Sequence, residues 1–312
     1  MGRKILITVL AGGVGAAKLI KGLINVVDQT ELTIIVNTGD DRKDHYGLYI
    51  TPDIDIIMYT ISGIVDPKKG WGIKNDSFNC LEMLNKYGLE TWFQLGDKDL
   101  ATHIYRTWLY KKGKKLHEIT QILCKCLNIK SKILPMTDEY TPTFIKTPNG
   151  IFHFEDYLIK RKCQDKVIDV IYQNIGKSEP APGVLESIEN SDGIIICPSN
   201  PIVSIGPIIR LKGIKKLLMK KNTIGISPIV GNKPIKGPAD KLMAGLGIEV
   251  SALGVAKIYQ DFIKKFIIDK IDEKYTSEIS KLGIKVYTFD TIMDSLDKKI
   301  ALAKFTLKLL YE

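Results

Sequence analysis

Short apolar runs rich in isoleucine and valine recur along the chain, and most of them end at glycine, proline or polar turn residues. Several runs are almost continuously hydrophobic and do not alternate with polar residues. Parallel strands that are covered on both faces have this pattern. The runs that predict strands are 5–10, 32–36, 166–173, 193–197, 223–226, 265–268 and 284–289.

Helical periodicity fills most of the intervals between these runs. The segments that predict helices are 16–27, 182–189, 208–220, 251–263 and 295–310. Strand and helix therefore alternate, which predicts an α/β fold with a doubly wound, mainly parallel, Rossmann-like sheet. In such a fold we expect ligands at the carboxyl ends of the strands.

The middle of the chain departs from this alternation. A mainly helical insertion is predicted at about 52–128, where Thr51 and Pro52 form a favourable helix start. The segment at about 140–154 predicts a small β-hairpin that turns at Asn149-Gly150. Because no low-complexity linker interrupts the chain, we predict that residues 1–312 form a single α/β domain carrying both elaborations.

The composition is that of a folded protein. Of the 312 residues, 45% are hydrophobic and 26% are charged, so the chain can bury a substantial core. No apolar run approaches the roughly 20 residues that span a bilayer, and a strand is predicted where a secretory signal would have its apolar segment. The five cysteines form no CxxC pair. We therefore expect a cytoplasmic protein with reduced thiols.

The net charge of +10 suggests anionic partners, either nucleic acid or phosphorylated small molecules. Most of the basic residues are lysines, and no stretch interleaves arginines with aromatic residues as base-stacking surfaces do. We therefore predict no dedicated nucleic-acid face. A basic nucleic-acid-binding protein remains the least favoured alternative.

A glycine-rich loop follows the first predicted strand. The stretch AGGVGAAK places Gly12, Gly13 and Gly15 at the strand end and Lys18 in the first turn of the next helix. Lys18 stands where a dinucleotide fingerprint has its third glycine, and the spacing is not that of a Walker loop. Glycine N–H groups at a helix N-terminus still favour an anion. We predict a phosphate-binding loop with Lys18 as its counter-charge; a tight turn without a ligand is the alternative.

The second candidate site is acidic. The loop after the second predicted strand and the helix start that follows it contain Asp40, Asp41, Asp44, His45, Asp53 and Asp55. Acidic residues in a first helical turn ordinarily complement the helix dipole, which explains Asp53 better than Asp55. Carboxylates beside a diphosphate also suit Mg²⁺, and one of them could deprotonate an attacking hydroxyl. Spacing alone favours neither role, so the metal ligands stay unassigned.

Two further stretches gather polar side chains. In QLGDKDLATHIYRTW, the residues Asp99, Thr102, His103 and Arg106 share one face of a predicted helix, although helix capping by Asp97 is a simpler reason for its first aspartate. In CPSNPIVSIGPI, a strand ends in Ser, Asn and Gly, a composition that suits recognition of a base or phosphate.

Eight stretches in order along the chain resemble the 2-phospho-L-lactate transferase family, which acts in the biosynthesis of the deazaflavin coenzyme F(420). They are AGGVGAAKLIKGL, VNTGDD, TPDIDIIMY, WGIKND, LGDKDLATHIYR, PSNPIVSIGPI, SPIVGNKPIKGPADKLM and GVAKIYQDF. The resemblance implies transfer of a phospholactyl group from lactyl-diphospho-guanosine to a ribityl hydroxyl of the deazaflavin Fo. The resemblance further implies that the products are coenzyme F(420)-0 and GMP and that Mg²⁺ is required, and it suggests a homodimer.

The resemblance also implies roles for particular residues. Gly12, Gly13, Gly15 and Lys18 would cradle the diphosphate, and Asn37, Thr38, Ser199 and Asn200 would hold the nucleotide. Asp55 matches a position that contacts Fo and is the candidate for holding or activating the acceptor hydroxyl. Gln94 stands where the family often has a basic acceptor-binding residue, so it can donate a hydrogen bond but supplies no charge.

Two alternatives stay open. AGGVGAAK resembles the loop of family branches that use an enolpyruvyl donor, giving the dehydro product, about as well as that of the lactyl branches. From the motifs alone, an NAD(P)-dependent oxidoreductase with a variant Rossmann loop is the runner-up. Against it, Lys18 replaces the third glycine, and Asn37 replaces the acidic residue that binds the ribose at the end of strand two.

Overall fold

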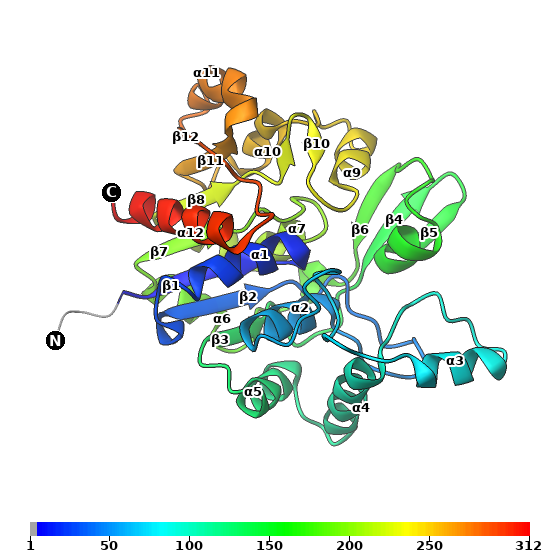
Figure 1. Ribbon diagram of the computed structural model, residues 1–312. Helices are drawn as coiled ribbons and strands as arrows, with labels where there is room; N and C mark the ends of the chain where they lie inside the picture. The colour runs from blue at the N-terminus through cyan, green and yellow to red at the C-terminus, as the bar shows by residue number, and fades with distance from the viewer. Residues whose placement is uncertain (1–4) are drawn as a thin grey trace.

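The computed structural model describes residues 5–312, which form a central sheet of seven parallel strands (Figure 1). The strands are β1 (Ile7–Ala11), β2 (Leu32–Val36), β3 (Lys132–Pro135), β7 (Gly193–Ile196), β8 (Thr223–Ile226), β11 (Lys265–Asp269) and β12 (Lys285–Phe289). Their order across the sheet is β12-β11-β8-β7-β1-β2-β3. The chain thus builds the sheet outward from β1, first toward β3 and then toward β12.

The direction of strand addition reverses between β1 and β7. At such a reversal, the loops that leave two neighbouring strands run to opposite faces of the sheet and leave a crevice between them. The loop after β1 begins at Gly12 and the loop after β7 begins at Cys197. The glycine-rich loop and the CPSNPIVSIGPI stretch therefore meet at one point of the sheet edge.

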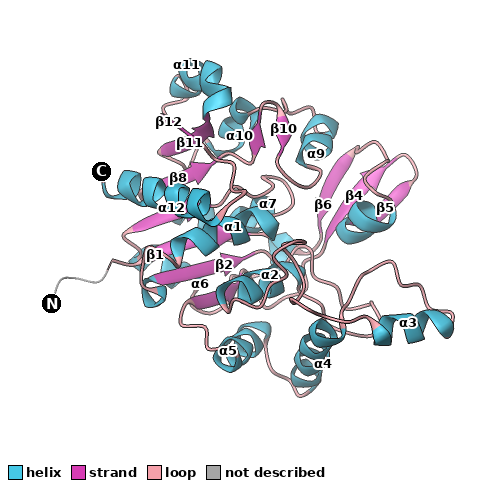
Figure 2. Ribbon diagram, viewed as in Figure 1, coloured by secondary structure: helices cyan, strands magenta, loops and turns pink. Residues whose placement is uncertain are grey.

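Helices cover both faces of the central sheet (Figure 2). Val9 faces one hydrophobic cluster and its neighbour Leu10 faces the other, as expected of a strand that is buried on both sides. One face carries α1 (Gly13–Leu23), α2 (Pro52–Ile61), α5 (Leu116–Cys126) and α12 (Leu296–Tyr311), and the other carries α6 (Val184–Asn190), α7 (Ile205–Arg210), α8 (Ile214–Leu218) and α10 (Ala252–Tyr259). The predicted doubly wound α/β fold is confirmed.

A smaller antiparallel sheet lies beyond the carboxyl ends of the central strands (Figure 1). It consists of β4 (Thr143–Thr147), β5 (Gly150–His153) and β6 (Asp169–Tyr172), in the order β5-β4-β6. The strands β4 and β5 form the predicted hairpin. The segment predicted as a strand at 166–173 therefore does not belong to the parallel sheet, because β6 pairs with β4.

Three other predictions differ from the structure. The edge strand β3 was not predicted, because its short apolar core is only Ile133 and Leu134. The helix predicted at 208–220 is interrupted, since α7 ends at Arg210 and Gly213 adopts a φ of 85° before α8 begins. The hairpin β9 (Ile229–Val230) and β10 (Lys233–Pro234), with α9 (Ala239–Gly245) and α11 (Thr276–Ser280), was also missed.

Two aspartates of the middle region cap two neighbouring helices. Asp97, the first residue of α4 (Asp97–Lys111), accepts hydrogen bonds from the backbone N–H groups of Asn79 and Cys80 at the start of α3 (Asn79–Lys86). Asp76 in turn accepts from the N–H groups of Lys98 and Asp99 in α4. Asp97 therefore caps the neighbouring helix and not its own, which fixes the loop before α3 against α4.

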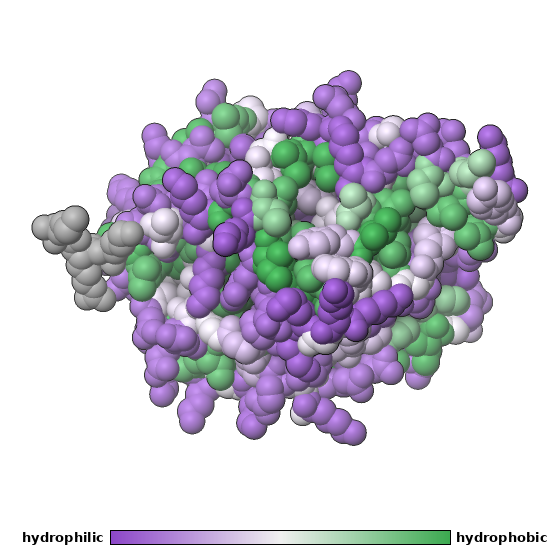
Figure 3. Space-filling model, turned by 90° about the horizontal axis from the view of Figure 1, so that it is seen from below, coloured by the Kyte–Doolittle hydropathy of each residue, from purple (hydrophilic) through white to green (hydrophobic). Residues whose placement is uncertain are grey.

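Within residues 5–312, no helix is both long and apolar enough to cross a membrane. The face of the molecule shown in Figure 3 is mainly polar, with apolar patches between the charged side chains. Exposed aromatic and aliphatic residues on α4 include Ile104, Tyr105 and Trp108.

Candidate active site

A cavity of about 470 Å³ opens at the carboxyl ends of the central strands. Its walls come from the loops after β1, β2, β7 and β8, from the starts of α2 and α4, and from the segment after β5. Eight of the predicted site residues line it together: Gly12, Gly13, Gly15, Lys18, Asp55, Gln94, Ser199 and Asn200. The cavity thus coincides with the reversal point of the sheet.

The glycine-rich loop has packing reasons for its glycines. Gly13 has a φ of +69°, which only glycine adopts readily. A Cβ on Gly12 would lie 2.6 Å from Ser204 Cβ, and one on Gly15 would lie 2.2 Å from the carbonyl oxygen of Pro198. The start of α1 therefore lies directly against the loop that follows β7. Glycines at these positions do not by themselves demonstrate a phosphate site.

Ser199 and Asn200 hold that second loop in place. Ser199 Oγ donates to the carbonyl oxygen of Gly12 over 2.7 Å, so it joins the two loops at the crevice. Asn200 Oδ1 accepts from the backbone N–H of Ile202 over 3.0 Å. The Asn200 amide nitrogen has no hydrogen-bond partner among residues 5–312, and Asn200 lines the cavity, so this nitrogen is available to a ligand.

The predicted nucleotide residues Asn37 and Thr38 are buried and do not line the cavity. Asn37 instead positions a carboxylate, because its Nδ2 donates to Asp53 Oδ2 over 2.9 Å. The other oxygen of Asp53 accepts from the backbone N–H of Gly13 over 2.7 Å. Asp53 thus already occupies one of the amide donors at the N-terminus of α1, between the glycine loop and α2.

Asp53 belongs to a buried acidic cluster that also contains Asp40 and Glu155. Burial raises the pKa of Asp53 to about 6 and, together with the charge of Asp53, raises the pKa of Glu155 to about 8. Burial and the charges of Asp53 and Glu155 raise the pKa of Asp40 well above its usual range. Asp40 Oδ1 has no hydrogen-bond partner among the described residues. Three carboxyl groups therefore share a space that disfavours three negative charges.

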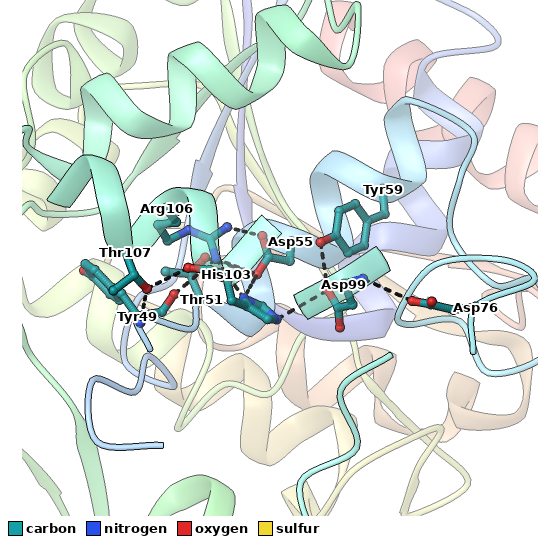
Figure 4. Close-up of polar contacts among 9 residues, drawn as sticks. All are labelled: Tyr49, Thr51, Asp55, Tyr59, Asp76, Asp99, His103, Arg106 and Thr107. Carbon is teal, nitrogen blue, oxygen red and sulfur yellow. Dashed lines mark hydrogen bonds and ion pairs between the residues drawn. The ribbon is translucent and has the colours of Figure 1, made fainter. Parts of the chain in front are cut away.

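Asp55 faces a different partner. Its carboxylate pairs with the guanidinium of Arg106, through Oδ2 and Nη1 at 3.1 Å and through Oδ1 and Nη2 (Figure 4). Arg106 is fully buried, and the pair joins the first turn of α2 to the middle of α4. Burial raises the pKa of Asp55 although Arg106 opposes the shift. A carboxylate with both oxygens held by an arginine is a fixed hydrogen-bond acceptor and a poor base.

His103 continues this network along α4 (Figure 4). Its Nδ1 lies 3.1 Å from Arg106 Nη1, and because a guanidinium only donates, Nδ1 accepts. Its Nε2 lies 3.4 Å from Asp99 Oδ1. Tyr59 donates to the same Asp99 oxygen over 2.8 Å. Burial alone would raise the pKa of Asp99, but the neighbouring His103 ring and the hydrogen bond from Tyr59 hold it below its usual value.

The polar residues predicted to share one helix face in QLGDKDLATHIYRTW therefore form a continuous polar network. The side chains of this network are buried: Asp99, His103 and Arg106. Their contacts connect the loop before α3 to Asp55 in α2. Thr102 lies on the same helix but does not line the cavity. Gln94 lines the cavity near the start of α4, and its Nε2 donates to the carbonyl oxygen of Thr91 over 3.1 Å.

One end of the cavity is apolar and aromatic. The residues that form it include Ile50, Trp92, Phe93, Leu158 and Ile159. Trp92 and Phe93 pack edge to face with ring centres 5.6 Å apart. Flat aromatic ligands bind well in such surroundings, where ring faces and aliphatic side chains exclude water.

Sequence reasoning missed three residues of the site. Glu155 follows the hairpin and is next to a second acidic residue, Asp156, and only the packing of this segment against the cavity shows its role. Trp71 and Lys236 come from loops without regular structure that meet at the cavity rim. The motif SPIVGNKPIKGPADKLM contains Lys236, but no spacing rule distinguishes it from the lysines around it.

Comparisons with known proteins identify the family of the chain. A family model described as 2-phospho-L-lactate transferase CofD matches residues 7–306. The 2-phospho-L-lactate transferase of Methanosarcina mazei is 41% identical over 300 residues, covering 96% of this chain and 99% of the relative. The enzyme of the same name from Methanocaldococcus jannaschii is 42% identical over 302 residues, covering 96% of each.

A solved structure supports the fold. The crystal structure of a upf0052 family member from Bacillus halodurans superposes with a TM-score of 0.68. It covers 98% of this chain and 100% of that chain at 15% sequence identity. At that identity the likeness concerns the fold and not the activity.

Proposed function

Because this chain belongs to the CofD family of 2-phospho-L-lactate transferases, we propose that it transfers a 2-phospholactyl group from lactyl-diphospho-guanosine to the deazaflavin Fo. The enolpyruvyl analogue is the alternative donor. The products are coenzyme F(420)-0, or its dehydro form, and GMP. The observation that carries the proposal is one cavity with cations and a glycine loop on one wall, carboxylates on another and an aromatic end.

The donor is proposed to lie across the reversal point of the sheet. Lys18, in the second turn of α1, lines the cavity and supplies positive charge for the diphosphate. Ser199 and Asn200 lie beside the same loop and would contact the nucleotide or its phosphates. Asn37 would act indirectly, through its hydrogen bond to Asp53. Catalysis of this kind depends mainly on positioning and on neutralising charge.

The acceptor is proposed to lie with its ring system in the aromatic end near Trp92 and its ribityl chain toward Asp55. The terminal hydroxyl oxygen attacks the phosphorus that carries the lactyl group, and the bond from that phosphorus to the GMP oxygen breaks. The hydroxyl proton is released to a carboxylate of the acidic cluster. Arg106 keeps Asp55 ionised and fixed, which favours holding the hydroxyl over deprotonating it. Gln94 would contribute a neutral hydrogen bond to Fo.

The residues present suit Mg²⁺. Asp40 and Asp53 are buried carboxylates that repel each other, and Asp40 Oδ1 has no partner among residues 5–312. No group of three His, Cys, Asp or Glu side chains in the described chain forms a complete metal site. Two carboxylates completed by phosphate oxygens and water are a usual arrangement for this ion. When bound, Mg²⁺ would neutralise charge on the diphosphate.

The decisive experiment measures GMP release. Purified protein is incubated with Mg²⁺, Fo and either the lactyl or the enolpyruvyl guanosine diphosphate, and the product is identified by mass spectrometry. We expect GMP and one F(420)-0 species; no GMP from either donor refutes the proposal. Separate titrations with GDP and NADH test the oxidoreductase alternative, since tighter binding of NADH would favour it.

We also propose that the enzyme is a cytoplasmic homodimer, as the family resemblance implies. Light scattering coupled to size-exclusion chromatography measures the mass of the particle in solution. A mass near 34.9 kDa, that of one chain, would contradict the dimer.

A further inference from the structure

A second lysine lines the cavity beside the one in the glycine-rich loop. Lys236 follows β10 and lines the cavity together with Lys18 of α1. Partial burial and the charge of Lys18 lower the pKa of Lys236. Neither lysine has a carboxylate partner among the ion pairs formed by residues 5–312. Two uncompensated ammonium groups close enough to repel each other therefore border the glycine loop.

Lys236 also contacts a loop that we call the strap, residues 66–72. Its Nζ donates to the carbonyl oxygen of Lys69 over 3.0 Å, across 167 positions of sequence. The strap is compact, because Asp66 Oδ1 accepts from the N–H groups of Lys68 and Lys69, and the Asp66 N–H donates to Gly72 over 3.0 Å. Lys236 thus ties two loops that have no regular structure.

The strap lies over the start of α1. A Cβ on Gly70 would be 3.3 Å from Val14 Cγ1, and Gly70 has a φ of +74°. Trp71 and Gly72 of the strap line the cavity. The contact between Lys236 and Lys69 therefore covers the part of the cavity that borders the glycine loop.

We propose that Lys236 is a donor-binding residue that bridges the diphosphate of the donor to the strap. An ammonium group has three N–H donors, and one of them serves the Lys69 carbonyl oxygen. The others remain for phosphate oxygens, so an anion binds without breaking the contact with the strap. The bound diphosphate relieves the repulsion between Lys18 and Lys236 and orders the strap over the donor. The inference rests on the proposed function for the identity of the ligand, a guanosine diphosphate.

The experiment compares the wild type with Lys236→Met, Lys236→Arg and the control Lys233→Met, which removes an exposed lysine of β10. Isothermal titration measures affinity for GDP, and hydrogen exchange measures protection of the strap amides with GDP and with guanosine. In the wild type, GDP and not guanosine should raise protection of residues 66–72. Lys236→Met should lose that gain and bind GDP about tenfold more weakly, the loss of roughly one charge-assisted hydrogen bond.

The remaining outcomes separate a role for Lys236 from the proposed function itself. Lys236→Arg should retain most of the affinity and Lys233→Met all of it. Equal GDP affinity in the wild type and Lys236→Met overturns the inference and leaves the proposed function intact. No binding of GDP to the wild type overturns both. If Lys236→Met is unfolded, the wild-type exchange data decide, because unchanged strap protection with GDP is incompatible with the bridge.

Discussion

Replacing Glu155 with glutamine tests whether the acidic cluster stores electrostatic repulsion. Glu155 is buried beside Asp53, and Arg42 compensates its charge only in part. Glutamine has nearly the same shape and remains neutral at every pH. The substitution therefore removes the ionisation of Glu155 while it leaves the volume of the side chain in the cavity wall.

The sign of the effect follows from the direction of the pKa shift. The folded protein holds the Glu155 proton up to a pKa of about 8, whereas the unfolded chain releases it near the ordinary pKa of a glutamate, 4.5. Between these values the folded state binds more protons, so its stability falls as pH rises. At about 1.4 kcal/mol for each tenfold change in proton affinity, this shift sets an upper limit of a few kcal/mol on the loss of stability. Rotation of the Glu155 carboxylate toward the open cavity lowers this limit. We therefore expect ionisation of Glu155 to reduce the free energy of unfolding by about 2 kcal/mol.

The assay is urea unfolding of the wild type, Glu155→Gln and the exposed control Glu189→Gln at pH 5 and pH 8, without Mg²⁺. The free energy of unfolding of the wild type should fall between the two pH values, and that of Glu155→Gln should fall by about 2 kcal/mol less. Glu189→Gln should follow the wild type. Parallel pH dependence of Glu155→Gln and the wild type would show that Glu155 is ionised in the folded protein and that the cluster stores no such repulsion.

Four further changes probe the other walls of the site. Lys18→Ala should weaken GDP binding about tenfold by titration and leave the melting temperature unchanged, because Lys18 has no carboxylate partner in the described chain; an equal loss of folding would make the lysine structural. Arg106→Met should cost about 3–5 kcal/mol in urea unfolding, since it leaves Asp55 buried and unpaired, and adding Asp55→Asn to it should recover part of that loss. Asp55→Asn alone should lower turnover or affinity for Fo in steady-state kinetics while GDP affinity persists. Unchanged kinetics would show that Asp55 has no role in binding or activating Fo. Mg²⁺ should raise the melting temperature of the wild type more at pH 8 than at pH 5, since it competes with protons for Asp40 and Asp53.

The strands that bring the site together were predictable because they are simple. Runs such as 32–36 and 193–197 are continuously apolar and end in polar loops, so both their type and the position of the ligand edge could be read from the sequence. Strand β3 could not be predicted, because it has only four residues, one of them an exposed lysine, and so shows no clear hydrophobic pattern. β6 was recognised as a strand but not assigned to the small sheet, since pairing with β4 is a long-range choice.

Within the site, sequence reasoning worked best for residues on regular elements. Asp99, His103 and Arg106 were placed on one face of α4 by helical spacing, and they do form a continuous network there. That Arg106 would pair with Asp55 of α2 depends on the packing of two helices, which spacing does not show. Glu155 and Lys236 reach the cavity from a hairpin and from an irregular loop, and their positions depend entirely on tertiary contacts.

The contacts of the glycine-rich loop give a packing reason for its glycines. Gly12 and Gly15 are required because Ser204 and the Pro198 carbonyl group lie where a Cβ would be, and the Gly13 N–H already serves Asp53. The glycines therefore bring α1, the loop after β7 and a carboxylate close together. Under the proposed function, the lysines around them would bind the phosphates. The cavity beside this loop is lined by Lys18 and Lys236 and also by Asp40 and Asp53. If the proposed diphosphate binds with Mg²⁺, it requires both kinds of charge, and the loop would then differ from sequence patterns that bind phosphate through backbone amides alone.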